Sequence, residues 1–301
     1  MSLSIICTGS SSTKISRWWL TVLTLLIYSN LFAQAPMSST EHNLPELYHQ
    51  TPYDLLVIAH RGASAYYPEN TMPSFRGAVE LNADMIELDI QLSKDGVPVV
   101  FHDAELTDHT NGQGMIADYT LKELKKLDAG SWFDQGFAGT HIPTLEEVLE
   151  YAGGKIALNI EIKTEAVTDS VKGGVEEKCL QLVKKYGMEK HVLFSSFDYR
   201  AVAHLRELDS DIPVAILYDP SQSNKMMPHQ LVKKYQADAF NCSHRQLSRK
   251  WVADLQKHDI PTFIYTVNGV RKMKKLIGVG VSGMFTNKPD LLLNLLTTTK
   301  Q

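Results

Sequence analysis

Short apolar runs alternate with amphipathic helical patterns along most of the chain. Nine runs are short and rich in Val, Ile, Leu and Phe, as buried strands are; they cover residues 55–60, 85–91, 97–102, 156–162, 192–196, 213–218, 238–242, 261–267 and 282–286. Apolar positions between them repeat at helical spacing; the helices expected are 71–81, 145–151, 175–186, 200–208, 229–235, 248–258 and 270–277. Repeated strand–helix alternation predicts an α/β fold with a parallel sheet.

The number of strands favours a (β/α)₈ barrel, which needs eight parallel strands. Nine candidates are one too many, and Ser93-Lys94-Asp95-Gly96 reads as a turn too short to join parallel strands. We therefore expect part of 90–98 to lie outside the parallel set. An open doubly wound sheet is the main alternative, and the pattern alone leaves both folds open.

Residues 104–143 interrupt the alternation after the third strand. They contain Asn111-Gly112-Gln113-Gly114, a helical stretch near 121–127, and the aromatic segment Ser131-Trp132-Phe133. A long excursion after the carboxyl end of a strand lies over the face where a barrel holds its ligands, so we expect a small inserted subdomain that helps to select substrate. The alternative is a stabilising cover with no role in recognition.

The N-terminus has the pattern of an export signal. Lys14 and Arg17 precede an apolar run over 18–27, and Ala33-Gln34-Ala35 matches a small-x-small cleavage site. We expect removal of residues 1–35, a linker over 36–53, a barrel domain over 54–295, and an exported protein, periplasmic or secreted, without a stable membrane anchor. An uncleaved anchor is the alternative, although Asn30 interrupts an apolar core already shorter than the ~20 residues of a membrane span.

Composition excludes some classes of function. The 301 residues are 44% hydrophobic and 21% charged, which is ordinary for a globular protein with a sizeable core. A net charge of −4 without a basic stripe argues against nucleic acid as a partner. No Gly-x-Ser-x-Gly elbow occurs, which disfavours serine hydrolase chemistry. Cys179 and Cys242 remain after the expected cleavage, and both a disulfide and two buried free thiols stay open.

Titratable side chains gather in or at the ends of four predicted strands. They are His60, Arg61, Glu87, Asp89, His102, Glu161 and Lys163. Since the carboxyl ends of parallel strands meet at the edge where α/β folds hold ligands, we expect these residues to lie together. Histidines, carboxylates and fixed cations in one place suit metal-assisted chemistry on a phosphate ester.

Glu87, Asp89 and Glu161 are the candidate metal ligands. Positions i and i+2 of a strand point to the same face, so Glu87 and Asp89 share one face of an apolar strand. Burying carboxylates is costly unless a positive charge neutralises them, and oxygen ligands suit Mg²⁺ or Ca²⁺. The alternative is a structural ion-pair network that includes Lys163.

His60 and His102 are candidates for acid–base catalysis. Cleavage of a phosphodiester needs a base for the attacking oxygen and an acid for the leaving alkoxide, and two imidazoles supply both. Each histidine could instead bind the metal. Arg61 offers a planar fork for phosphate oxygens, with a salt bridge to Glu69 or to a metal-site carboxylate as the alternative. Glu69 could orient a histidine, bind a substrate hydroxyl, or belong to a helix cap.

The order of these motifs resembles the glycerophosphodiester phosphodiesterase family over about residues 55–290. The matching segments are His60-Arg61-Gly62, Pro68-Glu69-Asn70-Thr71, Glu87-Leu88-Asp89, Lys94-Asp95-Gly96, His102-Asp103, Gly130-Ser131-Trp132-Phe133, Ile142-Pro143-Thr144-Leu145, Asn159-Ile160-Glu161-Ile162-Lys163, Ser196-Phe197 and Thr266-Val267-Asn268. The resemblance implies a TIM-type barrel that hydrolyses glycerophosphodiesters to glycerol 3-phosphate and an alcohol. Tyr265 stands where the family usually has tryptophan, and Asn287 where aspartate is common, which puts substrate fit in question more than activity.

The resemblance also implies roles for individual residues. It implies one divalent cation, Ca²⁺ or Mg²⁺, on the three carboxylates, His60 and His102 as the acid–base pair, and Arg61 on the phosphate. We expect Glu69, Lys163 and Asn268 to contact the substrate as well.

Two other functions stay open at this point. The first is a lysophospholipase-D-like or cyclising phosphodiesterase that acts on lipids, with an apolar channel built from Trp132, Phe133 and Phe137. The second is a barrel that binds a phosphodiester or a metal without turnover.

Overall fold

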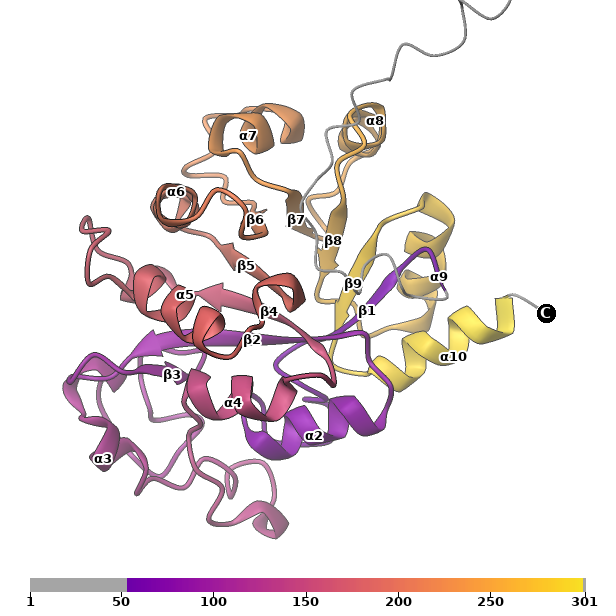
Figure 1. The fold of residues 1–301 in the computed structure, drawn as a ribbon. Helices are drawn as coiled ribbons and strands as arrows, with labels where there is room; N and C mark the ends of the chain where they lie inside the picture. The colour runs from indigo at the N-terminus through magenta and orange to yellow at the C-terminus, as the bar shows by residue number, and fades with distance from the viewer. Residues whose placement is uncertain (1–52, 300–301) are drawn as a thin grey trace, which may run out of the picture. The chain divides into compact units, whose positions relative to one another are not determined.

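Eight parallel strands close into a barrel in the computed structural model, which describes residues 53–299 (Figure 1). The barrel strands are β1 (Leu56–Ala59), β2 (Met85–Leu92), β4 (Ala157–Ile162), β5 (Val192–Ser196), β6 (Val214–Leu217), β7 (Ala239–Ser243), β8 (Thr262–Tyr265) and β9 (Gly283–Thr286). Strand β1 pairs with both β2 and β9, which closes the ring. The predicted barrel is confirmed, and the open sheet is wrong.

Helices connect the strands and lie outside the ring (Figure 1). The α-helices are α2 (Met72–Glu80), α3 (Leu121–Leu124), α4 (Leu145–Ala152), α5 (Val175–Lys185), α6 (Tyr199–Leu208), α7 (Pro228–Tyr235), α8 (Arg249–Lys257), α9 (Val270–Val279) and α10 (Pro289–Thr299). Short 3₁₀ turns cover η2 (Ile116–Asp118), η3 (Gln135–Phe137), η4 (Thr164–Ala166) and η5 (Glu189–His191). Helix α10 is absent from the predicted set, although Leu292 and Leu296, four residues apart, form its buried side.

The ninth strand explains the surplus in the predicted set. Strand β3 (Pro98–Val100) pairs antiparallel with the end of β2 through the predicted turn at 93–96. The prediction that His102 lies at the carboxyl end of a parallel strand is therefore wrong. Instead, β3 runs back towards the barrel, where the Phe101 N–H donates a 2.9 Å hydrogen bond to the Asp89 carbonyl. His102 therefore reaches the same edge from a hairpin.

The barrel interior changes from apolar to charged along its strands. Its apolar layer consists of Leu56, Ile58, Met85, Ala157, Leu193, Ala215, Ala239, Phe263 and Phe285. On β2, Glu87 and Asp89 follow Met85 on the same face, since side chains alternate along a strand. On β4, Glu161 follows Ala157 in the same way. The charged side chains thus project into the ring above the packed apolar layer.

Residues 104–143 fold around an apolar cluster of their own, near α3 in Figure 1. Its members are Val99, Phe101, Leu106, Ile116, Leu124, Ala129 and Ile142. The cluster includes Val99 and Phe101 from the β3 hairpin, so the insertion is packed against the hairpin that carries His102. The predicted role of this insertion in choosing substrate stays a prediction.

The remaining predictions about chain organisation have mixed outcomes. The predicted signal segment 1–35, and the linker 36–53 apart from Tyr53, lie outside the described residues. Cys179 and Cys242 are buried free thiols, and burial raises the pKa of Cys242 to about 12.

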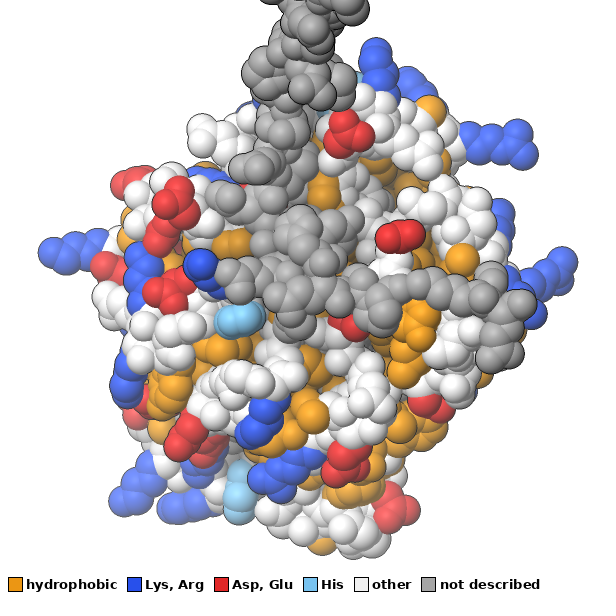
Figure 2. All heavy atoms as spheres, turned by 45° about the vertical axis from the view of Figure 1, so that its right-hand side comes forward, with side chains coloured by type: hydrophobic (Ala, Val, Ile, Leu, Met, Phe, Trp, Pro, Cys, Tyr) orange, Lys and Arg blue, Asp and Glu red, His pale blue; other side chains and the backbone are white. Residues whose placement is uncertain are grey.

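Among residues 53–299, no helix combines the length and hydrophobicity needed to cross a bilayer. Charged and hydrophobic side chains are interspersed over the face shown in Figure 2.

Candidate active site

The predicted residues converge around one cavity of about 190 Å³ at the carboxyl edge of the barrel. It is lined by His60, Arg61, Glu87, His102, Glu161, Lys163, Phe197, Leu217, Tyr265, Thr266 and Phe285. His60, Arg61, Glu87, Glu161 and Lys163 lie together as predicted, because the ring brings their strands to a common rim, and His102 joins them from the β3 hairpin. The cavity has the size of a small polar molecule, below the range of drug-sized ligands.

Glu87, Asp89 and Glu161 form a buried carboxylate group. One oxygen from each lies within 4.8 Å of the others. Asp89 on β2 is in register with Glu161 on β4. Burial, with the charges of Asp89 and Glu161, raises the pKa of Glu87 well above its usual value, and burial raises that of Glu161. This oxygen-only donor set could hold a metal ion, which would replace the proton that burial favours.

Asp89 lies close to two positively charged side chains, Arg61 and Lys163. Arg61 Nε lies 3.4 Å and Lys163 Nζ lies 3.3 Å from its oxygens. Burial opposes ionisation of Asp89, but these two cations outweigh it and hold its pKa below the usual range. The Asn70 amide also donates a 2.8 Å hydrogen bond to Asp89. Thr71 is the N-cap of α2, and Asn70, which precedes it, orients Asp89.

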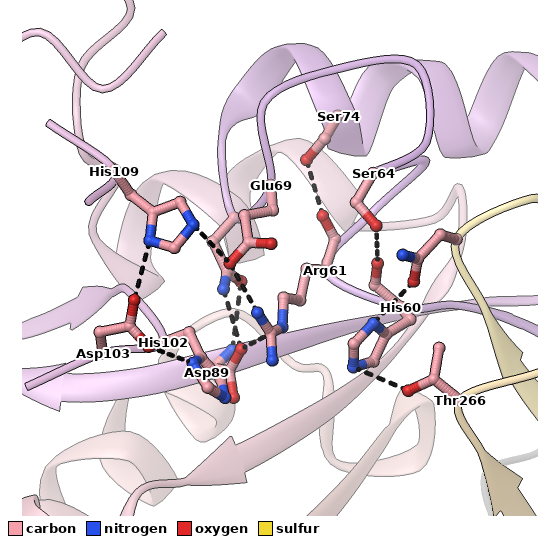
Figure 3. Close-up of polar contacts among 12 residues, drawn as sticks. His60, Arg61, Ser64, Glu69, Ser74, Asp89, His102, Asp103, His109 and Thr266 are labelled. Atoms are coloured by element: carbon pink, nitrogen blue, oxygen red, sulfur yellow. Dashed lines mark hydrogen bonds and ion pairs between the residues drawn. The ribbon is translucent and has the colours of Figure 1, made fainter. Parts of the chain in front are cut away.

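Arg61 is held by the turn that follows β1. Its backbone is left-handed at φ 54°, and its N–H donates to Glu87 Oε2 at 2.8 Å. Gly62 follows at φ +80°, where a Cβ would lie 2.6 Å from a backbone carbon of Ser74. The Arg61 guanidinium donates to Glu69 at 2.6 Å. Both salt bridges weighed for Arg61 are therefore present, and they fix its fork beside the cavity (Figure 3).

His60 is a neutral imidazole with one nitrogen directed towards the cavity residues. Nδ1 lies 2.8 Å from Asn287 Oδ1, which can only accept, so Nδ1 carries the proton. Nε2 lies 3.5 Å from Thr266 Oγ1 and 4.0 Å from Glu87 Oε2. Burial, and then the Arg61 cation, lowers the pKa of His60 to about 3. His60 therefore offers an unprotonated Nε2 as a proton acceptor.

His102 has a different partner. Its Nδ1 lies 2.6 Å from Asp103 Oδ1, and the other Asp103 oxygen lies 2.8 Å from Nδ1 of His109 (Figure 3). Burial opposes ionisation of Asp103, but hydrogen bonds and charge from the two histidines outweigh it and lower its pKa. Sequence reasoning missed His109, because it lies in the insertion outside any strand-end pattern. Its spacing from His102-Asp103 was the one available signal.

The other predicted substrate contacts differ in position. Lys163 lines the cavity with Nζ 2.8 Å from Glu161. Glu69 lies beside Arg61, with Oε1 3.9 Å from Nε2 of His109. Asn268 is exposed and is absent from the cavity lining; its Oδ1 accepts a 2.8 Å hydrogen bond from the Asn287 N–H. Asn268 thus supports the loop that holds the partner of His60, and its contact with substrate stays a prediction.

Comparison with known proteins identifies the family. The sequence model of the glycerophosphoryl diester phosphodiesterase family matches residues 60–291. The chain belongs to this family. A glycerophosphodiester phosphodiesterase of Caldanaerobacter subterraneus subsp. tengcongensis is 39% identical over 241 residues, covering 80% of this chain and 97% of the relative. One from Bacillus subtilis (strain 168) is 36% identical over 257 residues, covering 80% and 86%.

Solved structures agree with these relatives. A phosphodiesterase of Oleispira antarctica, in complex with the product sn-glycerol-3-phosphate, superposes with a TM-score of 0.74 at 29% identity. The match covers 83% of this chain and 99% of that chain. A glycerophosphodiester phosphodiesterase from Agrobacterium tumefaciens str. C58 matches with a TM-score of 0.69 at 27% identity, over 79% and 98%. The predicted resemblance and the predicted enzyme class, a glycerophosphodiester phosphodiesterase, are confirmed.

Proposed function

We propose that this enzyme hydrolyses glycerophosphodiesters to glycerol 3-phosphate and an alcohol, with one divalent cation and with His60 and His102 as base and acid. The observation that carries the proposal is the single small cavity on which two differently partnered histidines and the carboxylate group converge. The glycerol 3-phosphate bound by the Oleispira antarctica phosphodiesterase supports the product.

Charge in the site supports a cation together with a phosphodiester. When all three carboxylates are ionised, as a bound metal ion would require, Glu87, Asp89 and Glu161 oppose Arg61 and Lys163 and leave one net negative charge among these five groups. A divalent cation and a singly charged diester would bring that total to zero. Ca²⁺ and Mg²⁺ both fit an oxygen-only donor set. When bound, such an ion polarises phosphoryl oxygens and offsets negative charge that develops on them.

The histidines divide the proton transfers. His60 takes the proton of the nucleophile, water or the glycerol 2-hydroxyl, at its unprotonated Nε2. His102 delivers a proton to the leaving alkoxide, with its ring oriented by Asp103, whose Oδ1 lies 2.6 Å from Nδ1. The two histidines differ in their hydrogen-bond partners, Asn287 for His60 and Asp103 for His102, and the assignment of base and acid follows this difference. Attack by the 2-hydroxyl would proceed through a cyclic phosphate, and attack by water would not.

Phosphate binding falls to the fixed cations beside the cavity. Glu69 and Asp89 hold the Arg61 guanidinium in place, and Lys163 adds a second positive charge at the rim of the cavity.

The lipid alternative predicts a channel formed by Trp132, Phe133 and Phe137. Those rings pack edge-on against one another, with centroids 5.7 and 5.8 Å apart, and are absent from the cavity lining. This arrangement favours small, deacylated diesters.

The test is release of glycerol 3-phosphate from glycerophosphocholine and glycerophosphoethanolamine. The purified chain is assayed as isolated, after chelation, and after return of Ca²⁺ or Mg²⁺, with lysophosphatidylcholine in parallel. We expect release that chelation abolishes and one of the ions restores. His60→Ala and His102→Ala should each lower kcat by about 10²–10⁴. His141→Ala, an exposed histidine of the insertion, should not.

Each other outcome points to a specific alternative. Release of choline from the lysophospholipid alone would support the lipid-acting enzyme. Binding of a diester without turnover of any substrate would support the non-catalytic barrel. Near-normal turnover in either histidine variant would refute its assignment. Export, like removal of residues 1–35, remains a proposal, which mass measurement of the chain recovered from its native host would test.

A further inference from the structure

Asp103 bridges two imidazoles at the edge of the active site. One carboxylate oxygen lies 2.6 Å from Nδ1 of His102, and the other lies 2.8 Å from Nδ1 of His109 (Figure 3). A carboxylate bound through one oxygen can still turn about its last torsion, which is broad for aspartate. A second hydrogen bond to the other oxygen removes that freedom. The geometry therefore makes the orientation of Asp103 depend on His109.

His109 is itself held on several sides. Its ring lies edge-on against Trp132, with centroids 4.5 Å apart and planes at 84°, and it also meets Phe101 at 6.3 Å. Its Nε2 lies 3.9 Å from Glu69 Oε1, the oxygen that accepts from Arg61. The charged groups that face His109 are thus Asp103 and Glu69, one towards each ring nitrogen. His109 therefore links the insertion to Asp103, which contacts His102, and to Glu69, which contacts Arg61.

We propose that His109 is a positioning residue for the acid His102. It fixes the Asp103 carboxylate, and Asp103 in turn accepts a hydrogen bond from the Nδ1–H of His102, which orients the ring so that Nε2 and the proton it delivers face the substrate. Partners of this indirect kind orient catalytic imidazoles in many sites, and their loss usually lowers activity by about 10–100-fold. The proposal rests on the proposed function, since it assumes that His102 is the acid.

Substitutions that alter one nitrogen at a time test the proposal. In asparagine the amide nitrogen is as many bonds from Cβ as Nδ1 of histidine, so His109→Asn keeps the donor to Asp103. His109→Leu removes the hydrogen-bond donor. His109→Gln moves the donor one bond further from Cβ, and this variant replaces His109→Leu in the test if the leucine variant does not fold. His229→Leu is the matched control, because His229 makes a 2.7 Å contact with Asp254 at similar exposure, 30% against 24%.

The expected result is a loss confined to kcat. His109→Leu and His109→Gln should lower kcat by about 10–100-fold with KM changed less than about threefold, while His109→Asn restores kcat to within about threefold. His229→Leu should leave both parameters unchanged. In an Asp103→Asn background, His109→Leu should cause little further loss, since its effect acts through Asp103. An unchanged kcat in His109→Leu, an asparagine variant as slow as the leucine one, or a full additional loss in the Asp103→Asn background would overturn the proposal.

A spectroscopic measurement separates this proposal from the proposed function. ¹⁵N NMR of histidine-labelled enzyme reports which ring nitrogen of His102 carries the proton, with or without turnover. In the neutral ring that remains once Nε2 has given up its proton, we expect the remaining proton on Nδ1 in the wild type and in His109→Asn, and a mixture of tautomers in His109→Leu. If the wild type hydrolyses no diester, the proposed function fails, and these spectra still decide the role of His109. An identical His102 spectrum in all three proteins would refute it.

Discussion

Replacing Glu87 by glutamine should stabilise the enzyme without metal and destabilise it, relative to the wild type, with metal. Glutamine keeps the size of the side chain and an oxygen to accept the 2.8 Å hydrogen bond from the Arg61 N–H. It removes one of three carboxylates whose oxygens lie within 4.8 Å of one another. Two unit charges at that distance repel by about 3.5 kcal/mol at an effective dielectric constant of ~20.

Proton uptake limits the size of this effect. Burial and the two neighbouring carboxylates raise the pKa of Glu87 well above 4.5 in the folded state. The folded wild type therefore binds more protons than the unfolded chain above that pH, so its stability falls as pH rises from about 4.5 through the folded pKa. The variant lacks this dependence. We expect its advantage to grow with pH and to reach about 1–3 kcal/mol at pH 8, or roughly 3–8 °C in Tm.

The assay is thermal unfolding at pH 5 and pH 8, with chelator and with saturating Ca²⁺ or Mg²⁺. A cation at 100 times its Kd stabilises the wild type by about 2.7 kcal/mol, and the variant, which has lost one ligand, should gain much less. The order of the two Tm values should therefore reverse on adding metal. Glu176→Gln is the control: Glu176 is buried and its pKa is raised by burial, but it pairs with His204 away from the cluster. A lower Tm for Glu87→Gln in chelator at pH 8, or an equal gain from metal, would contradict the reasoning.

Three further substitutions probe the turn and the partners of the reacting groups. Gly62→Ala should destabilise the fold by more than about 1 kcal/mol, measured by urea unfolding, since its φ of +80° and its contact with Ser74 exclude a Cβ; unchanged stability would refute the close fit. Arg61→Lys should raise KM for the diester because lysine lacks the fork that Glu69 orients; an unchanged KM would remove Arg61 from phosphate binding. Asn287→Asp should raise the pKa of His60 and move the acid limb of the kcat/KM–pH profile upward by about 1–3 units, because a carboxylate favours protonated His60; a profile that stays in place would show that His60 is not the base.

Much of the site can be predicted because most of its charged side chains lie on barrel strands or directly after them. Side chains alternate along a strand, so the spacing of Glu87 and Asp89 is enough to place both on one face of β2. The apolar run before His60 locates the end of β1, and parallel strands in an α/β fold end at one rim. The family resemblance adds the order of the motifs and the substrate class, which periodicity alone does not contain.

Contacts made from loops cannot be predicted in the same way. Asn70 has the sequence position of a cap residue, but its left-handed backbone at φ 55° directs the amide to Asp89. His109 meets Asp103 within a loop, six residues further along the chain, where no strand or helix periodicity places a side chain. Asn268 supports the backbone of Asn287, although its position after β8 suggests a ligand contact. Loop geometry depends on packing between distant segments, and no local pattern encodes it.

Hydrophobic periodicity is therefore enough to specify the class of fold, the parallel strands and the residues carried at their ends, because strand geometry repeats every two residues and buried strands must be apolar. Tertiary structure decides three other features. They are the pairing of β1 with β9 that closes the ring, the antiparallel β3 strand that brings His102 to the site, and the different hydrogen-bond partners of His60 and His102. These features depend on pairings between residues far apart in the chain, such as His60 with Asn287, whose free energy exists only once the barrel has formed. They set which hydrogen-bond partner each histidine has.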